Sequence, residues 1–274
     1  MIKLIAIDLD GTFFHARGKV SPVNVRALEK VRAKGIKVVI ATGRVYVTSD
    51  PIIAPFAQAV DCISTCNGAA CYYPGNPEAF GREGIPTEDA VSLIEFLERR
   101  EVFYRCYIDG RISYSRPSAS LLERYRAMFT ILEGDAGSTD VRDNLAAYLR
   151  ETGQQVEKFF LLFPNPEEAK AFRPQLPQQE KFSITSSFAN NIELTRAGVD
   201  KGTGLAFLGK LWGIRREEMM AIGDSENDLA MLRYAGESVA MGNALPELKA
   251  QCKHVTLKNT EDGVAHIIEK LVLS

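Results

Sequence analysis

Two aspartates, a glycine and a threonine follow the first apolar run of the chain. Residues 2–7 lead directly into the sequence Asp8-x-Asp10-Gly11-Thr12. Because side chains two apart on an extended chain point to the same side, both carboxylates can face one pocket beyond a strand end. Ligands of open parallel sheets bind at that edge. Taken alone, the segment also fits an acidic turn, in which Asp and Gly are common.

A second acidic group occupies residues 223–228, directly after the short apolar run 219–222. It contains Asp224, Asn227 and Asp228. Carboxylates gathered at the end of a buried strand are unfavourable unless a cation neutralises them. Oxygen ligands of this kind favour Mg²⁺ over a softer metal. The alternative is a solvated helix N-terminus, which also favours acidic residues.

Two further segments carry groups suited to phosphate. Thr42, Gly43 and Arg44 follow the apolar run 36–41. A hydroxyl and free backbone N–H groups at a strand-to-helix turn are good donors to phosphate oxygens. Lys201 begins a stretch with helical spacing and would bring one positive charge. Each segment alone fits a helix cap or a surface lysine, so the interpretation depends on their occurring together.

The elements that position these groups alternate between strands and helices near both chain ends. Apolar runs predict strands at 2–7, 36–41, 61–65, 219–222, 238–241 and 254–257, and helical spacing predicts helices at 22–34, 201–212, 228–234 and 262–271. Strand and helix alternation with short links is typical of a parallel α/β sheet.

The middle of the chain has a different pattern. A helix is predicted to begin at Thr87, where acidic residues fill the first turn. Residues 103–108 and 111–114 flank an Asp-Gly pair at 109–110, which is a strong signal for a β-hairpin. Residues 156–163 form the clearest further strand. Hairpins mixed with helices indicate an α+β unit with antiparallel strands.

These patterns predict a fold and a division of the chain. We expect a doubly wound α/β core with a parallel sheet, built from residues 1–82 and 189–274. An inserted α+β unit, here called the cap, would occupy residues 83–188. The chain has 274 residues, which is enough for two such units.

Composition excludes several classes of function. Lys and Arg total 33 against 35 for Asp and Glu, and the two signs are mixed along the chain. No basic stripe is available for a nucleic-acid backbone, so we expect no nucleic-acid partner. The apolar runs are too short to span a bilayer, and the N-terminus lacks the features of a signal peptide. The five cysteines contain no C-x-x-C pair, which favours buried thiols in a reducing cytoplasm.

The four motifs, in their order along the chain, resemble those of the haloacid dehalogenase superfamily. The resemblance is closest to its Cof-type sugar-phosphatase subfamily. The resemblance covers residues 2–73 and 191–271. Further matches to the subfamily are Cys66-Asn67-Gly68-Ala69, Gly198-Val199-Asp200-Lys201-Gly202, Met231, Met241-Gly242-Asn243-Ala244 and Glu261-Asp262-Gly263-Val264. One departure is Phe13-Phe14, where aliphatic residues are more usual; we expect it to alter the flap over the pocket and not the chemistry.

The resemblance implies a role for each motif. Asp8 would be the nucleophile and Asp10 the general acid and base, with Thr42 and Lys201 completing the catalytic set. The residues expected to bind substrate or phosphate are Gly11, Thr42, Gly43, Arg44, Asn67, Lys201 and Asn227. The expected Mg²⁺ ligands are Asp8, Asp10 through its main-chain carbonyl, Asp224, and Asp228 either directly or through water.

The implied function is a Mg²⁺-dependent phosphatase that hydrolyses small phosphorylated metabolites, sugar phosphates foremost, through an aspartyl-phosphate. One alternative keeps the site but transfers the phosphoryl group to a second metabolite, as a phosphomutase or phosphotransferase does. Another is a non-catalytic regulatory protein that binds a phosphorylated metabolite. The intact pair Asp8 and Asp10 disfavours the second alternative, because binding alone does not need Asp10. The sequence leaves the oligomeric state open.

Overall fold

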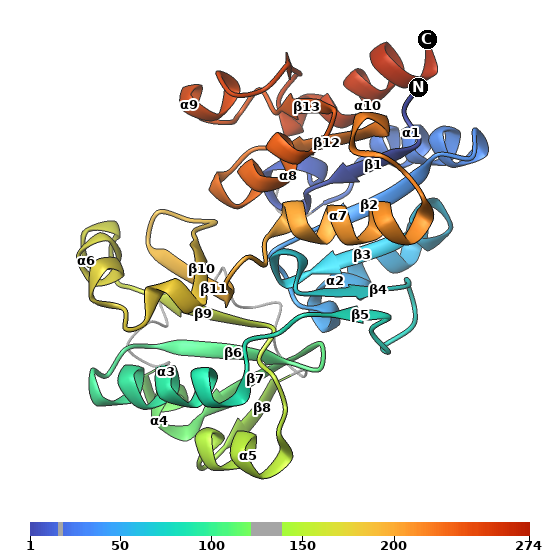
Figure 1. Cartoon of the computed structure of the whole chain (residues 1–274). Coiled ribbons are helices and arrows are strands. Elements are labelled where there is room, and N and C mark those ends of the chain that lie inside the picture. The colour runs from blue at the N-terminus through green and yellow to red at the C-terminus, as the bar shows by residue number, and fades with distance from the viewer. Residues whose placement is uncertain (16–18, 122–138) are drawn as a thin grey trace.

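The computed structural model describes residues 1–15, 19–121 and 139–274, and these form two β-sheets with their helices (Figure 1). The larger sheet and its helices contain both chain ends. The smaller sheet and its helices are built from the middle of the chain. The polypeptide therefore leaves the larger unit once and returns to it once.

The larger sheet has parallel strands at its centre. Its strand order is β14 (His254–Val255), β13 (Glu237–Ala240), β12 (Met219–Gly223), β1 (Leu4–Ile7), β2 (Lys37–Ala41), β3 (Cys62–Thr65), β4 (Ala70–Tyr72) and β5 (Gly81–Arg82). Neighbours from β14 to β3 are parallel, whereas β4 and β5 pair antiparallel at one edge. Ile7 of β1 is in register with Ile40 of β2 and Ile222 of β12. The predicted motifs that follow these three strands therefore emerge at one edge of the sheet.

Helices cover both faces of the larger sheet. They are α1 (Pro22–Ala33), α2 (Tyr46–Ile53), α7 (Lys201–Trp212), α8 (Leu229–Tyr234), α9 (Pro246–Lys249) and α10 (Gly263–Ile268). Leu28 of α1 and Ile267 of α10 belong to the core on one face, and Leu205 of α7 and Met231 of α8 belong to the core on the other. Buried apolar residues on both faces explain why the strands read as continuous apolar runs.

Local signals place two of these helices as predicted. The hydroxyl of Ser21 accepts a hydrogen bond from the Val23 N–H at 3.2 Å, and Pro22 occupies the first turn of α1. Asp200 caps α7 by accepting from the Thr203 N–H at 2.8 Å. Helix α7 begins at Lys201 and ends at Trp212, which confirms the predicted bounds.

The smaller sheet is mainly antiparallel. Its strand order is β10 (Phe182–Thr185), β11 (Asn191–Arg196), β9 (Lys158–Leu162), β6 (Tyr104–Ile108), β7 (Arg111–Ser115) and β8 (Thr139–Arg142). The helices of this unit are α3 (Thr87–Arg99), α4 (Arg116–Leu121), α5 (Leu145–Thr152) and α6 (Pro166–Phe172). Strands β6 and β7 form the predicted hairpin, with Asp109 and Gly110 at its turn. This arrangement confirms the predicted fold class, a parallel α/β core with an inserted α+β unit.

The two faces of the smaller sheet have different neighbours. Leu93 of α3 and Leu149 of α5 pack with the sheet on one face. On the other face, Tyr107 and Phe160 form a shared cluster with Val45 and Cys66 of the larger unit. The second face therefore lies against the core domain.

The structure differs from the sequence interpretation at one boundary. Residues 189–274 were expected to belong to the core, but β11 pairs with β9 and β10 of the smaller sheet. The chain therefore returns to the larger unit after Arg196. Strand pairing is a non-local property, so a change in the local pattern near residue 191 did not reveal it. Strand β1 also begins at Leu4 and not at residue 2.

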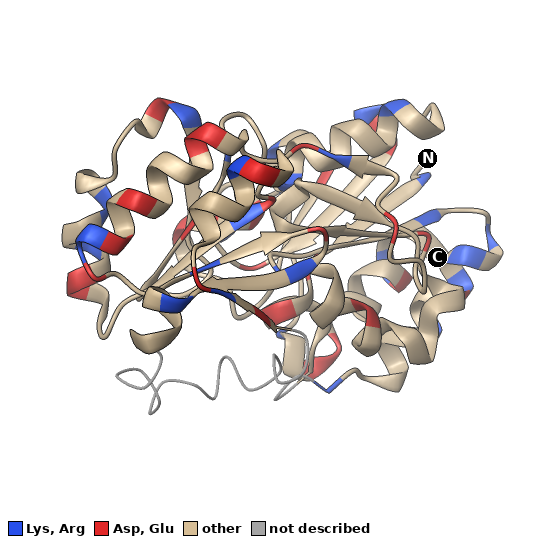
Figure 2. Ribbon diagram, turned by 90° about the horizontal axis from the view of Figure 1, so that it is seen from below, with Lys and Arg blue, Asp and Glu red and all other residues tan. Residues whose placement is uncertain are grey.

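The distribution of charged residues and the state of the cysteines in the structure agree with the sequence analysis. Acidic and basic residues are interspersed along the ribbons of both units (Figure 2). All five cysteines carry free thiols, and Cys252 is more exposed than the other four, which are buried. Among the described residues, no helix is long and apolar enough to cross a membrane.

Candidate active site

Asp8 stands at the carboxyl end of β1 and is almost completely buried. Lys201, the first residue of α7, reaches it from the other end of the chain. Lys201 Nζ lies 2.6 Å from Asp8 Oδ1 and 2.7 Å from Asp228 Oδ1. The Lys201 side chain is fully buried, so its charge is neutralised by these two carboxylates and not by water.

Three carboxylates converge beside this lysine. Asp8, Asp224 and Asp228 each offer an oxygen, and these oxygens lie within 4.8 Å of one another. The Thr12 hydroxyl donates to Asp224 Oδ1 at 2.9 Å, and the backbone N–H groups of Asp224 and Ser225 donate to Asp228 Oδ2 at 2.9 and 3.0 Å. The donor set is hard oxygen throughout, so these residues could hold a small divalent cation.

The electrostatics of this cluster favour a bound cation. Burial raises the pKa of Asp8 well above its usual value; Lys201 opposes the shift, and Asp228 and Asp224 add to it. Burial, with Asp228, raises the pKa of Asp224 to about 7. Burial would lower the pKa of Lys201, but Asp228 and Asp8 raise it overall. A divalent cation would stabilise the ionised carboxylates that burial disfavours.

Gly11 brings the first motif against Asp224. Its φ of +82° lies in the region that favours glycine. A Cβ atom built on Gly11 would lie 2.3 Å from Asp224 Oδ2. The chain therefore turns sharply after Asp10, and this turn makes room for the second acidic motif.

Asp10 does not join the three clustered carboxylates. Its two oxygens accept hydrogen bonds from Arg44 Nε and Nη2, each at 2.7 Å. The Arg44 guanidinium also lies over the Phe14 ring, with its central carbon 5.4 Å from the ring centroid. The unusual Phe14 therefore contacts the arginine that holds the Asp10 carboxylate. Arg44 was expected to bind substrate or phosphate; in this arrangement it pairs with Asp10.

The loops after β2, β3 and β12 meet through amides. The Asn67 N–H donates to the Thr42 carbonyl oxygen at 3.1 Å. Asn227 Nδ2 donates to Asn67 Oδ1 at 3.1 Å, and both side chains are buried. A Cβ atom built on Gly43 would lie 3.0 Å from Asn67 Oδ1. The structure thus brings together Thr42, Gly43, Asn67 and Asn227, four of the residues expected to bind substrate or phosphate.

Two charged residues of the smaller sheet were missed from the sequence. Lys158 of β9 and Glu193 of β11 are buried at this interface and contact Gly43 and Asn67 respectively. The sequence contains no signal for Glu193, because it occupies a polar position in the alternating strand Asn191–Arg196, a pattern that is typical of a solvent-facing side chain. Lys158 lay inside the predicted strand 156–163, and its residue type favours an exposed position.

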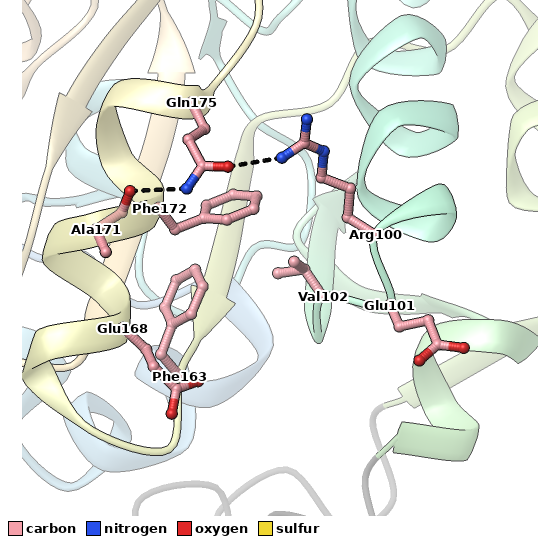
Figure 3. Close-up of a pocket in the computed structure, with 8 residues that line it drawn as sticks. All are labelled: Arg100, Glu101, Val102, Phe163, Glu168, Ala171, Phe172 and Gln175. Carbon is pink, nitrogen blue, oxygen red and sulfur yellow. Dashed lines mark hydrogen bonds between the residues drawn. The ribbon is translucent and has the colours of Figure 1, made fainter.

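A separate hollow of about 370 Å³ lies within the smaller unit (Figure 3). Its lining includes Arg100, Phe163, Phe172 and Gln175, and Arg100 Nη1 donates to Gln175 Oε1 at 2.7 Å. None of its lining residues belongs to the predicted catalytic set. The acidic cluster at the sheet edge is therefore the better candidate for chemistry.

The chain is thus an α/β protein with a parallel sheet, acidic residues at the carboxyl edge of that sheet and an inserted unit beside that edge. The model for haloacid dehalogenase-like hydrolases matches residues 5–268. Phosphatase YwpJ of Bacillus subtilis is 32% identical over 288 residues, which cover 99% of this chain and all of YwpJ. Pyridoxal phosphate phosphatase YbhA of Escherichia coli is 30% identical, and the match covers 97% of each chain.

A solved structure shares the whole architecture. A haloacid dehalogenase-like hydrolase from B. subtilis superposes with a TM-score of 0.86 at 28% identity, covering 99% of this chain and 100% of that one. The chain therefore belongs to the family of haloacid dehalogenase-like hydrolases. It is a phosphatase, an enzyme that hydrolyses phosphoric monoesters.

Proposed function

We propose that this phosphatase uses Asp8 as a nucleophile and Mg²⁺ as a cofactor to hydrolyse small phosphorylated metabolites. The observation that carries the proposal is the buried contact of Asp8 with Lys201 beside Asp224 and Asp228. Phosphoryl transfer needs a nucleophile, a positively charged side chain such as Lys201 and a set of hard oxygen ligands for a metal ion.

Asp8 and Lys201 would carry the first step. An Asp8 carboxylate oxygen attacks phosphorus, the bond from phosphorus to the leaving oxygen breaks, and an aspartyl-phosphate forms. Lys201 keeps the attacking carboxylate ionised and draws negative charge from the phosphoryl oxygens. The Thr42 hydroxyl, the Gly43 N–H and the Asn227 amide would donate hydrogen bonds to the same oxygens.

Asp10 would act first as a general acid and then as a general base. It protonates the leaving alkoxide and then takes a proton from the water that cleaves the aspartyl-phosphate. The pair with Arg44 holds the Asp10 carboxylate away from the acidic cluster. We therefore infer that Asp10 must exchange this pairing for contact with the substrate, with Arg44 and Phe14 supporting its resting position.

Asp8 and Asp224 would hold Mg²⁺ together with the main-chain carbonyl of Asp10. Asp228 already accepts hydrogen bonds at both oxygens, which supports a role in orienting Asp224 and Lys201 or in holding a metal-bound water. When bound, Mg²⁺ supplies positive charge that polarises the phosphoryl group.

The division into core and cap would follow the two sheets. We infer a core of residues 1–82 and of the chain after Arg196, with the cap between them. The cap face that carries Tyr107 and Phe160 lies against the core, which supports a role in selecting the leaving group. Sugar phosphates are the first candidates, by resemblance to the Cof-type subfamily. Pyridoxal phosphate is the second, because YbhA is named for it. Free thiols support a cytoplasmic location.

The direct test uses purified protein, Mg²⁺ and a panel of phosphorylated metabolites with p-nitrophenyl phosphate. Phosphate release should require Mg²⁺ and should be lost in Asp8→Asn but not in Asp143→Asn, an exposed cap variant. Acid-quenched wild-type enzyme should carry a hydroxylamine-labile phosphate on Asp8. Full activity of Asp8→Asn would remove Asp8 as the nucleophile. Labelled phosphate that appears on a second sugar, and not in solution, would indicate a transferase.

A further inference from the structure

Two oppositely charged side chains are buried on the cap face that lies against the core. Lys158 of β9 and Glu193 of β11 are 1% and 2% exposed. Lys158 Nζ lies 3.2 Å from Glu193 Oε2. Taking two ions out of water is unfavourable unless hydrogen bonds satisfy their remaining donors and acceptors. The other hydrogen-bond partners of Lys158 and Glu193 therefore indicate the role of this ion pair.

The further partner of Lys158 belongs to the core. Its Nζ donates to the carbonyl oxygen of Gly43, in the loop after β2. The N–H on the other side of the same residue is the proposed donor to phosphate. A cation of the cap thus holds the backbone of the phosphate loop.

Glu193 reaches a second core loop. Its Oε2 accepts a hydrogen bond from Asn67 Nδ2 at 2.6 Å, in the turn after β3. Asn67 Oδ1 in turn accepts from Asn227 Nδ2 at 3.1 Å, in the loop after β12. On the cap side, Glu193 Oε1 accepts from Ser187 Oγ at 2.6 Å and Asn191 Nδ2 at 3.2 Å. Both carboxylate oxygens are therefore fully engaged.

Each member of the pair favours the ionised form of the other. Burial lowers the pKa of Lys158, and Glu193 limits the shift. Burial would raise the pKa of Glu193, but Lys158 and the hydrogen bonds from Ser187 and Asn67 lower it overall. Charged groups make shorter and stronger hydrogen bonds than neutral ones, so the contacts to Gly43 and Asn67 are directional and firm.

We propose that Lys158 and Glu193 are positioning residues for phosphoryl transfer: when the cap meets the core, they fix Gly43 and Asn67, and through Asn67 the amide of Asn227. This inference rests on the proposed function of those core residues. The contacts exist only while the two sheets lie together, so alignment of the phosphate loop depends on cap closure. In this proposal neither Lys158 nor Glu193 contacts the reacting atoms.

Stability alone does not account for the pair. A buried ion pair replaced by apolar residues of similar volume often leaves stability unchanged or raises it. The double variant Lys158→Met with Glu193→Leu therefore removes the positioning contacts while keeping the interface filled. It separates a role in alignment from a role in folding.

The first measurement is kinetic. The double variant should lower kcat/KM by roughly tenfold to a hundredfold, because a small misplacement of a catalytic loop has effects of this size. The factor should be the same for p-nitrophenyl phosphate, sugar phosphates and pyridoxal phosphate, since the phosphoryl group is common to all. Lys181→Met, which removes a cap ion pair with Asp89, should leave kcat/KM unchanged. A factor that differs widely among leaving groups would overturn the inference in favour of direct substrate recognition.

The second measurement does not need activity. Cys66 belongs to the core, yet its Sγ lies 3.6 Å from Glu157 Oε2 of the cap, so reagents reach it only when the cap moves away. In a Cys252→Ser background, the double variant should speed labelling of Cys66 by a thiol reagent several-fold. Labelling of Cys62 and Cys71, which lie inside the core, should not change and so excludes unfolding.

The two measurements distinguish the possible failures. Wild-type protein without phosphatase activity would contradict the proposed function, while Cys66 labelling would still test closure by Lys158 and Glu193. An active wild type with an equally active double variant would overturn the inference alone. Unchanged Cys66 labelling in the double variant would equally overturn it.

Discussion

Lys201 and Asp8 lie 193 positions apart in the sequence, yet Lys201 Nζ is 2.6 Å from Asp8 Oδ1. Both side chains are buried, and Lys201 also contacts Asp228 at 2.7 Å. One lysine therefore balances two carboxylates from different loops. Changes at this lysine should therefore affect both stability and reaction.

Lys201→Met should abolish activity and destabilise the protein. Breaking a buried ion pair by removing one partner costs about 3–5 kcal/mol, because an uncompensated charge remains. The free energy of unfolding from urea titration in EDTA should fall by about that amount, with part of the loss recovered in Mg²⁺. Lys210→Met, an exposed position on the same helix, serves as the control. Equal stability of the Lys201 variant and this control would contradict the proposed role of Lys201.

Mg²⁺ binding should depend on pH through Asp224. The folded-state pKa of about 7 lies above the ordinary value near 4, because burial and Asp228 disfavour the ionised form. Protonated Asp224 is a poor ligand, so Mg²⁺ affinity measured by calorimetry should weaken as pH falls through 7. The same dependence should be smaller in Asp224→Asn, and an unchanged slope would rule out Asp224 as its source.

The stability of the metal-free protein should have the opposite pH trend. A group whose pKa is raised on folding contributes stability below its unfolded value, and that contribution is lost as pH rises through the folded value. For Asp224 the loss should extend from about pH 4 to above pH 7. Thermal unfolding in EDTA and in Mg²⁺ across this range should give two curves that separate as pH rises toward about 7 and then stay a constant distance apart. Parallel curves would argue against metal binding at these carboxylates.

Asp10→Asn should slow turnover by about 10²–10⁴-fold, the usual contribution of a general acid or base. p-Nitrophenolate is a good leaving group and needs little protonation. The variant should therefore slow formation of the aspartyl-phosphate less than its hydrolysis. Rapid-quench measurement should then show a burst of p-nitrophenolate with an accumulating phosphoryl-enzyme. The double variant Asp8→Asn with Asp10→Asn should show no burst. Steady turnover without accumulation in Asp10→Asn would assign the water-activating role to another residue.

Gly11→Ala should weaken Mg²⁺ binding as well as folding. The added methyl group would lie 2.3 Å from Asp224 Oδ2, in a backbone conformation with φ of +82°. Gly35→Ala is the matched control, because Gly35 also has a positive φ, of +76°, but no atom lies within 4 Å of its added Cβ. Both variants should lose about 1 kcal/mol of stability from backbone strain, and Gly11→Ala alone should lose Mg²⁺ affinity in calorimetry. Equal Mg²⁺ affinities would mean that Asp224 tolerates displacement.

Much of the core could be predicted from the sequence because its signals are local. Apolar runs predicted β1, β2 and β12, and Asp8, Thr42 and Asp224 directly follow these strands. A strand buried on both faces has a recognisable composition, and parallel strands align their carboxyl ends. Residue types and strand ends together therefore predicted which side chains would gather at one edge of the sheet.

The tertiary structure alone decided how the two units meet. The pairing of β11 with β9 placed Glu193 beside Lys158, and the approach of the smaller sheet brought both to Gly43 and Asn67. It also turned Asp10 toward Arg44 and away from Asp224. Such contacts depend on burial and on partners distant in the chain. Local periodicity does not predict these contacts, because the same strand pattern is compatible with either sheet and with different side-chain partners.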